Sequence, residues 1–452
     1  MNGNKESFYP GQIDRTEDLD FQTKAHGHPI TRRQFVRNAT AAMGNLAIIS
    51  APFGIPSTPN ALYAMENSEP GKEGISVIGP YGHWAAALTE KELPAFSFRR
   101  EEWSDLDAWR KAARQRAAER LAIPDIGGTP EVSVTKQYSF DGLHVEELSW
   151  QLPYGRPTQA ILLKPLSSKE PLPGILAFHD HGGNKYFGKR KITRTTDQPH
   201  SSIEEHQKHY YQDRAWANEI AKRGYVVLVS DAFPFASRRV MLQDVPERLR
   251  KELNDNDPEN PDNIKAYNRW AGEHESIMAK SLFCAGTTWP GVFFAEDRKA
   301  LDILCAREDV DQSRIGCGGL SGGGMRTVFM GGLDPRIKCA VCVGFMTTWK
   351  DFLLNKSFTH TWMTYVPLLP HELDFPEILA LRTPLPTLVQ NDADDFLYTM
   401  PEMERADKIL QEVYHKAGAP DSYKCSFYPG PHKFDTPMQL EAFDWFDRWL
   451  KA

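Results

Sequence analysis

A serine set among glycines, where a strand meets a helix, is the feature of this sequence that most constrains the fold. The pentapeptide GLSGG, with Ser321 at its centre, follows an apolar run at 314–318 and precedes a helical pattern at 323–330. Between a strand and a helix, Gly-x-Ser-x-Gly is typical of a sharp, strained turn whose neighbours must lack bulk. Such a turn lifts the hydroxyl above a sheet and directs the Gly322 amide toward a bound molecule. The sequence therefore predicts a nucleophile at Ser321, against the plainer alternative of a connecting turn.

The rhythm of the rest of the chain fits a sheet around this turn. Alternating runs at 132–140 and 143–152, joined by Asp141-Gly142, and a third at 158–163 predict an antiparallel start. Apolar strands are then expected at 174–178, 225–230, 314–318, 338–343, 385–390 and 423–428, with helices at 204–223, 291–307, 323–330, 401–416 and 436–450. Because such alternation produces parallel sheets covered on both faces, the predicted fold class is α/β, with a mostly parallel central sheet and helices on both faces.

Three insertions interrupt this rhythm. Residues 183–202 are basic and polar, 242–274 are rich in Pro, Asn and Asp, and 345–383 are rich in aromatic residues. Segments that follow parallel strands lie at the carboxyl edge of the sheet, where ligands bind. We therefore expect lid-like elements and pocket walls from these insertions.

The first 64 residues are typical of an export signal. The run TRRQFVR, with the pair Arg32 and Arg33, precedes a modestly apolar stretch at 39–52. It is similar to the Ser/Thr-Arg-Arg-x-Phe-Leu-Lys pattern of twin-arginine signals, from which Val36 and Arg37 depart conservatively. The similarity implies a periplasmic or extracellular protein, with the twin-arginine export machinery as a partner.

The chain thus divides into three expected parts. A leader at 1–64 is followed by an extension at 65–130, which holds an amphipathic helix at 101–121, and by a catalytic domain at 131–452. The net charge of -7 argues against a nucleic-acid partner, which needs a basic face. No stretch has the length and apolarity of a stable transmembrane helix.

The six cysteines are not expected to form structural disulfides. Export by the twin-arginine route implies folding in a reducing compartment, where thiols persist. Four of them also lie inside apolar helix or strand patterns, where cysteine behaves as a small core residue. These four are Cys305, Cys317, Cys339 and Cys342.

A nucleophilic serine needs a base and an acid, and both occur near the end of the chain. His432 lies in YPGPHKF, between the last expected strand and the last expected helix, and the strand before that one runs into NDADDF. Sheet hydrolases often read P-T-L-V-x-H-G-x-x-D at this point, with the acid nine residues after the proline. Counting from Pro386 gives Asp395, with Asp394 as the alternative. Asp392 stands where a turn glycine is usual, so we expect it to form the turn.

Two backbone amides are expected to bind the negative charge that develops on a substrate carbonyl. The Gly322 amide is one. The other should come from HDHGGN, the loop after strand 174–178, where the register gives the amide of either His181 or Gly183, and we favour His181. The His and Asp side chains of this loop also suit zinc, but no second cluster of fitting spacing follows. We therefore expect no metal and no other cofactor.

With these residues in place, the chain resembles the acetyl-xylan-esterase-related branch of the dienelactone-hydrolase-like α/β-hydrolases. The resemblance covers about residues 132–450 and rests on FHDHGGN, AKRGYVVLVSDAFPF, GTTWPGVFFAEDRKALDIL, VDQSRIGCGGLSGGGMR, LDPRIKCAVCVGFMTTW, PLPTLVQNDADDFLY and YPGPHKF. It implies the α/β-hydrolase fold and a cofactor-free ester hydrolase, whose site residues are Ser321, Asp395 and His432, with the amides of His181 and Gly322. Two loops depart from the family, which has glycine where Asp180 and Asp392 stand.

The resemblance implies a serine hydrolase that forms an acyl-enzyme with a carboxylic ester, an acetyl ester of a carbohydrate being one candidate. A serine peptidase of the same fold is the nearest alternative, because a triad alone does not choose between ester and amide. A binding protein on a hydrolase scaffold with an inactive site and a metal-dependent hydrolase are the others.

Overall fold

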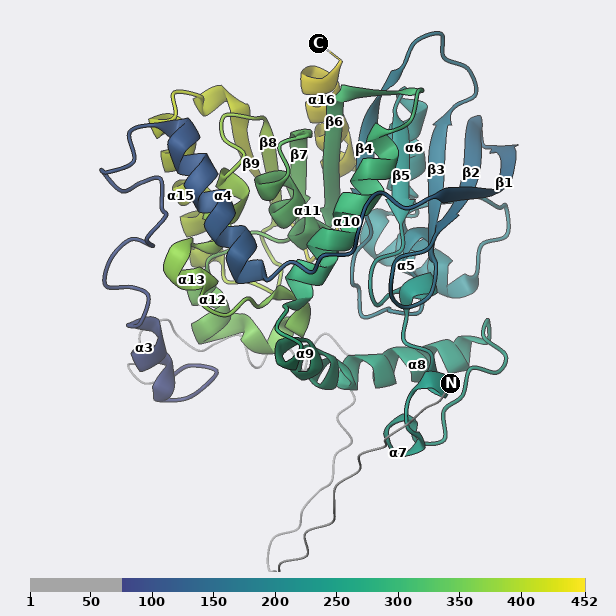
Figure 1. Ribbon diagram of the computed structural model, residues 1–452, viewed down its shortest axis with the longest axis horizontal. Coiled ribbons are helices and arrows are strands. Elements are labelled where there is room, and N and C mark those ends of the chain that lie inside the picture. Colours follow the sequence, from purple (N-terminus) through teal and green to yellow (C-terminus); the bar gives the residue numbers. More distant parts are fainter. Residues whose placement is uncertain (1–74, 452) are drawn as a thin grey trace, which may run out of the picture. The chain divides into compact units, whose positions relative to one another are not determined.

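A nine-stranded mixed sheet forms the centre of the part of the chain that the computed structural model describes, residues 75–451 (Figure 1). The strands lie side by side in the order β1-β2-β3-β5-β4-β6-β7-β8-β9. In chain order they are β1 (Val132–Phe140), β2 (Leu143–Trp150), β3 (Thr158–Pro165), β4 (Leu172–Phe178), β5 (Val226–Ser230), β6 (Val310–Leu320), β7 (Ile337–Val343), β8 (Thr387–Asp392) and β9 (Tyr423–Tyr428).

The sheet begins antiparallel and continues parallel. β1, β2 and β3 pair antiparallel in sequence, and β3 also pairs antiparallel with β5. Every further pair, from β5 and β4 across to β9, is parallel. The predicted antiparallel start, followed by parallel strands with helical connections, is therefore confirmed. The carboxyl ends of β4 to β9 meet at one edge of the sheet, and this edge is where ligands bind in such folds.

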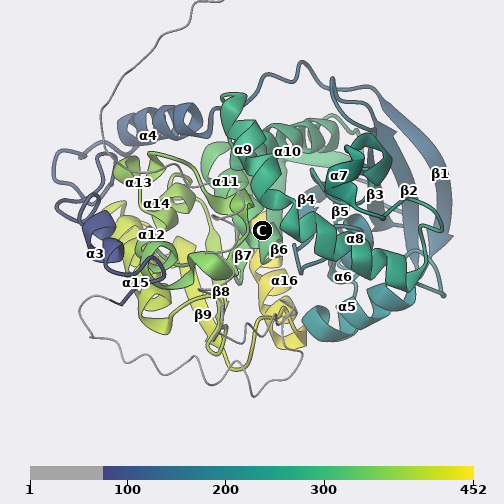
Figure 2. The ribbon, with the colours of Figure 1, turned by 90° about the horizontal axis from the view of Figure 1, so that it is seen from below.

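Helices cover both faces of the sheet (Figures 1 and 2). Alternate residues of β4 enter different apolar cores: Leu176 and Phe178 enter one, Ile175 and Ala177 the other. This burial on both sides is why the strand is apolar throughout. Residues of α4 (Leu106–Leu121), α10 (Trp289–Cys305), α11 (Gly322–Leu333), α14 (Phe375–Ala380) and α15 (Met400–Lys416) belong to the first core, and residues of α6 (Trp216–Lys222) and α16 (Thr436–Leu450) to the second.

Two expected helices differ in extent from those in the structure. The helix expected at 204–223 is two helices, α5 (Ser201–Tyr211) and α6, because Gln212 and Asp213 both adopt positive φ angles, 55° and 61°. Neither residue is a glycine, so the sequence carries no signal for this break. The helix expected from residue 101 begins only at Leu106, where the side chain of Asp105 accepts hydrogen bonds from two amides of the first turn.

The N-terminal extension, two of the insertions and the segment after residue 274 contribute further helices. The remaining α-helices of the described chain are α3 (Tyr81–Ala86), α7 (Glu247–Arg250), α8 (Pro261–Glu273), α9 (Glu275–Cys284), α12 (Trp349–Asp351) and α13 (Leu369–Glu372). None of the helices in residues 75–451 is both long and apolar enough to cross a membrane. The expected export signal lies outside the described residues.

Candidate active site

Ser321 stands on the turn between β6 and α11, in the strand-turn-helix context that the sequence predicts. Its backbone has φ 58° and ψ -119°, a conformation that residues with side chains rarely adopt. A Cβ atom at Gly319 or at Gly323 would overlap the carbonyl oxygen of Phe178 at the end of β4. The two glycines are therefore needed because the turn packs directly against the neighbouring strand.

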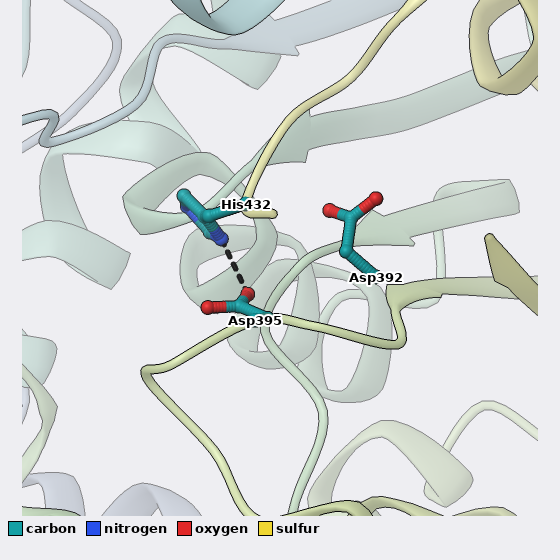
Figure 3. A group of neighbouring side chains, drawn as sticks. All are labelled: Asp392, Asp395 and His432. Atoms are coloured by element: carbon teal, nitrogen blue, oxygen red, sulfur yellow. Dashed lines mark hydrogen bonds and ion pairs between the residues drawn. The ribbon is translucent and has the colours of Figure 1, made fainter. Parts of the chain in front are cut away.

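His432 and Asp395 are hydrogen-bonded to each other at the same edge of the sheet (Figure 3). The Nδ1 atom of His432 lies 2.6 Å from Oδ2 of Asp395, and both side chains are largely buried. The other carboxylate oxygen of Asp395 accepts a hydrogen bond from the Leu397 amide at 3.0 Å. This second bond fixes the carboxylate and directs Oδ2 toward the imidazole.

The environment of His432 suits a general base. Burial opposes the charged imidazole, but the negative charges of Asp395, Asp392 and Asp180 together outweigh it, so the pKa of His432 is raised above its usual value. Because an ionised carboxylate only accepts, Nδ1 donates the proton in this bond and the neutral ring keeps a free electron pair on Nε2. Nε2 is buried and makes no hydrogen bond with another residue of the described chain.

Ser321 is held at the end of β7, the strand end that His432 also approaches. The Ser321 amide donates to the carbonyl oxygen of Val343 at 2.9 Å. The next residue, Gly344, has φ 58°, and a Cβ atom there would come within 2.9 Å of Cε1 of His432. The absence of a side chain at Gly344 therefore allows the imidazole to pack against the end of β7. Gly344 was not among the predicted site residues, although a glycine directly after the apolar strand 337–343 was a usable signal.

The two other acids of the same loop have different partners. Asp394 is exposed at its carboxylate, which accepts a hydrogen bond from the Gly430 amide at 2.9 Å, and the Asp394 amide donates to the Gly430 carbonyl at 3.1 Å. Asp394 therefore holds the turn that carries His432. The geometry brings Asp395, and not Asp394, to the imidazole.

Asp392 begins the turn, as expected, because its carbonyl oxygen accepts a hydrogen bond from the Asp395 amide at 3.2 Å. It is the last residue of β8, is fully buried, and accepts a hydrogen bond from the Lys433 amide at 2.9 Å. Burial raises the pKa of this carboxyl to about 7. The strand ends two residues later than predicted, at 392, so the carboxyl of Asp392 lies in the interior.

Asp392, Asp395 and His432 could together hold a metal ion, since one ligand atom of each lies within 4.8 Å of the others. Such an ion would compete with the bond between His432 and Asp395. The loop after β4, by contrast, does not gather ligands. His179 contacts the amide of Ala232, while the Asp180 carboxylate contacts His206 and Tyr211.

The amides of His181 and Gly322 lie next to each other. A Cβ atom at Gly322 would come within 2.9 Å of the His181 nitrogen. Gly322 is the first residue of α11, where an amide has no partner within the helix. The Gly183 amide, the alternative that the sequence left open, donates to Nδ1 of His181 at 3.1 Å. That bond occupies Gly183 and leaves His181 as the better-placed donor.

No family model matches the chain. A Bacillus subtilis (strain 168) protein assigned as a hydrolase, YtaP, is 26% identical over 309 residues, which cover 68% of this chain and 88% of that protein.

Solved structures with similar folds include two esterases. A Bacteroides fragilis NCTC 9343 protein assigned as an acetyl xylan esterase matches 76% of this chain and 81% of its own, with a TM-score of 0.56 and 17% identity. A glucuronoyl esterase from Solibacter usitatus matches 79% and 97%, with a TM-score of 0.53 and 15% identity. The sheet order, the layers of helices and these neighbours together establish that the chain has the α/β-hydrolase fold.

Proposed function

We propose that the protein hydrolyses carboxylic esters, with Ser321 as nucleophile, His432 as base and Asp395 as the acid. The observation that carries the proposal is the 2.6 Å contact between His432 and Asp395 beside the strained backbone of Ser321. A base whose orientation is fixed by an acid, next to a serine on such a turn, is what acyl transfer requires.

The reaction proceeds in two halves. His432 Nε2 takes the proton of the Ser321 hydroxyl as Oγ bonds to the ester carbonyl carbon, and the carbonyl oxygen becomes an oxyanion held by the amides of His181 and Gly322. The carbonyl reforms as the ester C–O bond breaks, and the departing alcohol takes the proton from Nε2. Water then attacks the acyl-serine with His432 again as base, which releases the carboxylic acid and restores Ser321.

The proposed substrates are esters of carbohydrates. Two structural neighbours carry the names acetyl xylan esterase and glucuronoyl esterase, and the shared fold supports a common reaction class. The twin-arginine pattern around Arg32 supports the same substrates, because an exported enzyme meets polymers outside the cytoplasm. We propose that the protein acts in the periplasm or outside the cell.

A fluorophosphonate probe tests the serine mechanism. We expect the probe to label the wild-type protein and Ser321→Ala to abolish labelling, while a chelator changes nothing. Loss of the nucleophile should lower kcat by roughly a million-fold, as in other triads. An alanine variant that keeps its activity, or a wild type that loses it with chelator, contradicts the mechanism.

A substrate panel tests the choice of substrate. The purified protein is assayed on p-nitrophenyl acetate, an acetylated xylo-oligosaccharide, a methyl uronate and a peptide p-nitroanilide. Turnover of the carbohydrate esters above the anilide is the expected result. The reverse order would make the protein a peptidase.

A further inference from the structure

Lys191 is fully buried beneath the loop that carries the proposed oxyanion amide. It comes from the basic insertion at 183–202. Its Nζ atom donates to the carbonyl oxygens of Asp180 at 2.8 Å and of His181 at 2.9 Å. The ammonium also lies 3.6 Å from the Asp180 carboxylate and 4.9 Å from the centre of the Phe235 ring.

The geometry of the peptide unit links Lys191 to the site. The Asp180 carbonyl and the His181 N–H belong to one planar, trans peptide, so the two groups point in opposite directions. A cation fixed on the carbonyl therefore directs the N–H away from itself. On the other side of this peptide lies Gly322, where a Cβ atom would come within 2.9 Å of the His181 nitrogen.

We propose that Lys191 is a positioning residue, which orients and polarises the peptide between Asp180 and His181 so that its N–H binds the oxyanion. The inference rests on the proposed ester hydrolysis. Hydrogen bonds in series polarise one another, and a charged donor strengthens the effect. The ammonium thus makes the His181 N–H a stronger donor, which matters most when the substrate oxygen carries negative charge.

The surroundings show why this cation is tolerated in the interior. A buried charge is costly unless it is paired and hydrogen-bonded. The Asp180 carboxylate supplies the opposite charge and is itself held by the Tyr211 hydroxyl at 2.5 Å and by Nε2 of His206 at 3.0 Å. Asp180 therefore has a role that the family's glycine could not fill, because glycine has no carboxylate to balance the lysine.

The charge of Lys191 is sensitive to alkaline pH. Burial lowers its pKa to about 8, with Lys185 acting in the same direction and Asp180 and Asp231 opposing it. The imidazoles of His179 and His181 also lie near this ammonium, but burial lowers both of their pKa values, so they are neutral here.

Loss of this proton gives a falling limb in the pH profile. Above pH about 8 a neutral amine can still donate to the carbonyls, but it polarises them less, so kcat should fall and then level off. Deprotonation of Lys191 does not destabilise the folded protein, so unfolding is not the cause of this limb. Its pKa in the folded state is below the ordinary 10.5, so the unfolded chain binds the proton more tightly and stability from Lys191 rises with pH.

The test compares Lys191→Met with Lys189→Met. Methionine keeps the length of the side chain and removes the donor. Lys189 binds the buried carboxylate of Asp231 at 2.8 Å and touches no carbonyl of the oxyanion loop, so its variant is the control for loss of a neighbouring buried pair. We expect Lys191→Met to lower kcat on p-nitrophenyl acetate by about ten- to a hundred-fold, with KM within about three-fold, because a whole oxyanion donor is worth 100- to 1,000-fold.

A trifluoromethyl ketone gives the second readout, because its adduct with Ser321 presents an oxyanion. Its affinity should fall in Lys191→Met by about the same factor as kcat and stay unchanged in Lys189→Met. Equal kcat and ketone affinity in Lys191→Met and the wild type would overturn the inference. An active Ser321→Ala would instead overturn the proposed function, so the two failures are distinguishable.

The wild-type pH profile decides the matter if Lys191→Met does not fold. As pH rises, His432 becomes the neutral, active base and Asp392 becomes charged, so neither of them produces a falling limb. Loss of a cation near the site, by contrast, lowers kcat. A falling limb above pH about 8 that persists in Lys185→Met supports Lys191, and a profile that stays level to pH 10 rejects it.

Discussion

The adjacent acids Asp394 and Asp395 have opposite environments. Asp395 is buried and contacts the imidazole of His432 at 2.6 Å, whereas the exposed Asp394 carboxylate holds the Gly430 amide at 2.9 Å. Two neighbouring side chains in a short loop point in different directions, so only one of them reaches the ring. The difference is one of geometry, and it gives a direct test.

We expect Asp395→Asn to lower kcat by at least about a hundred-fold, because the amide removes the charge and favours the wrong imidazole tautomer. Asp394→Asn should stay within about ten-fold, since it alters one exposed contact. Both variants are measured on p-nitrophenyl acetate, and their melting temperatures are compared to separate chemistry from stability. The opposite ranking would assign the acid to Asp394.

The pKa of His432 predicts an acid limb. The base works only when neutral, so kcat/KM should fall as pH drops through its pKa, which Asp395 and Asp392 hold above the ordinary 6.5 against the effect of burial. Removing the Asp395 charge should move the limb to lower pH. Asp392→Asn should move it less, because Asp395 contributes more. A limb at the same pH in all three proteins would mean that another group is titrating.

The serine turn and the histidine loop were predictable because each depends on a short local pattern. GLSGG between strand and helix requires only neighbours in sequence, as does YPGPHKF after the last strand. Asp395 followed from a count along one strand. Lys191 could not be found this way, because its partners are carbonyl groups that any residue would offer.

The elements were predicted better than their ends. Every strand of the sheet was expected, the first two from alternating residues and the central ones from apolar runs bounded by polar residues. The break at Gln212 and the late start of α4 at Leu106 were missed, because a positive φ at a non-glycine residue and a single Asp cap are weak signals. The contacts between the insertions and the sheet were not predictable, since they join segments far apart in sequence.

One such contact fastens α9 to the loop after β4. Glu275, at the start of α9, accepts hydrogen bonds from Nε2 of His181 at 3.1 Å and from Nζ of Lys185 at 2.5 Å. Nδ1 of His181 accepts a hydrogen bond from the Gly183 amide, so the proton of the neutral ring lies on Nε2. The Nε2–H group then donates to the Glu275 carboxylate. α9, which directly follows the insertion at 242–274, thus stabilises the oxyanion loop.

Removing this carboxylate should be costly. Glu275→Ala leaves the Lys185 ammonium buried without its counter-charge, and breaking such pairs costs about 3–5 kcal/mol of unfolding free energy. Urea unfolding measures the loss, and adding Lys185→Met should recover part of it. The exposed pair Lys251–Glu273, in the insertion directly before α9, is the control, and Glu273→Ala should cost under about 1 kcal/mol. Equal losses at the two sites would show that the buried pair is not what holds α9.

Across the whole molecule, the site is assembled from segments that are distant in sequence. Ser321 follows β6, Asp395 follows β8 and His432 follows β9, while the oxyanion loop follows β4. The parallel order brings all four strand ends to one edge, so the sheet performs the assembly and the insertions only support it. The whole domain must therefore fold before any part of the site exists.

This dependence bears on the proposed export. Cys317, Cys339 and Cys342 are buried in the central strands β6 and β7, and burial raises the pKa of the Cys317 thiol to about 12. A chain that folded in an oxidising compartment would expose these thiols to disulfide formation, whereas a chain folded in the cytoplasm buries them first. The proposed signal is similar to those of a route that carries proteins already folded, which fits this order of events.

Replacing Arg32 and Arg33 together by lysine should therefore trap a folded, active precursor in the cytoplasm. Lysine keeps both charges and removes the paired guanidinium groups, so a loss of export would show that the transporter reads guanidinium rather than charge. Cell fractionation and an esterase assay of each fraction measure the effect, with Arg37→Lys as the control, because lysine is the usual residue at that position of the signal. Unchanged export of the double variant would reject the export proposal while leaving the hydrolase mechanism intact, and an inactive cytoplasmic precursor would mean that folding needs the outer compartment.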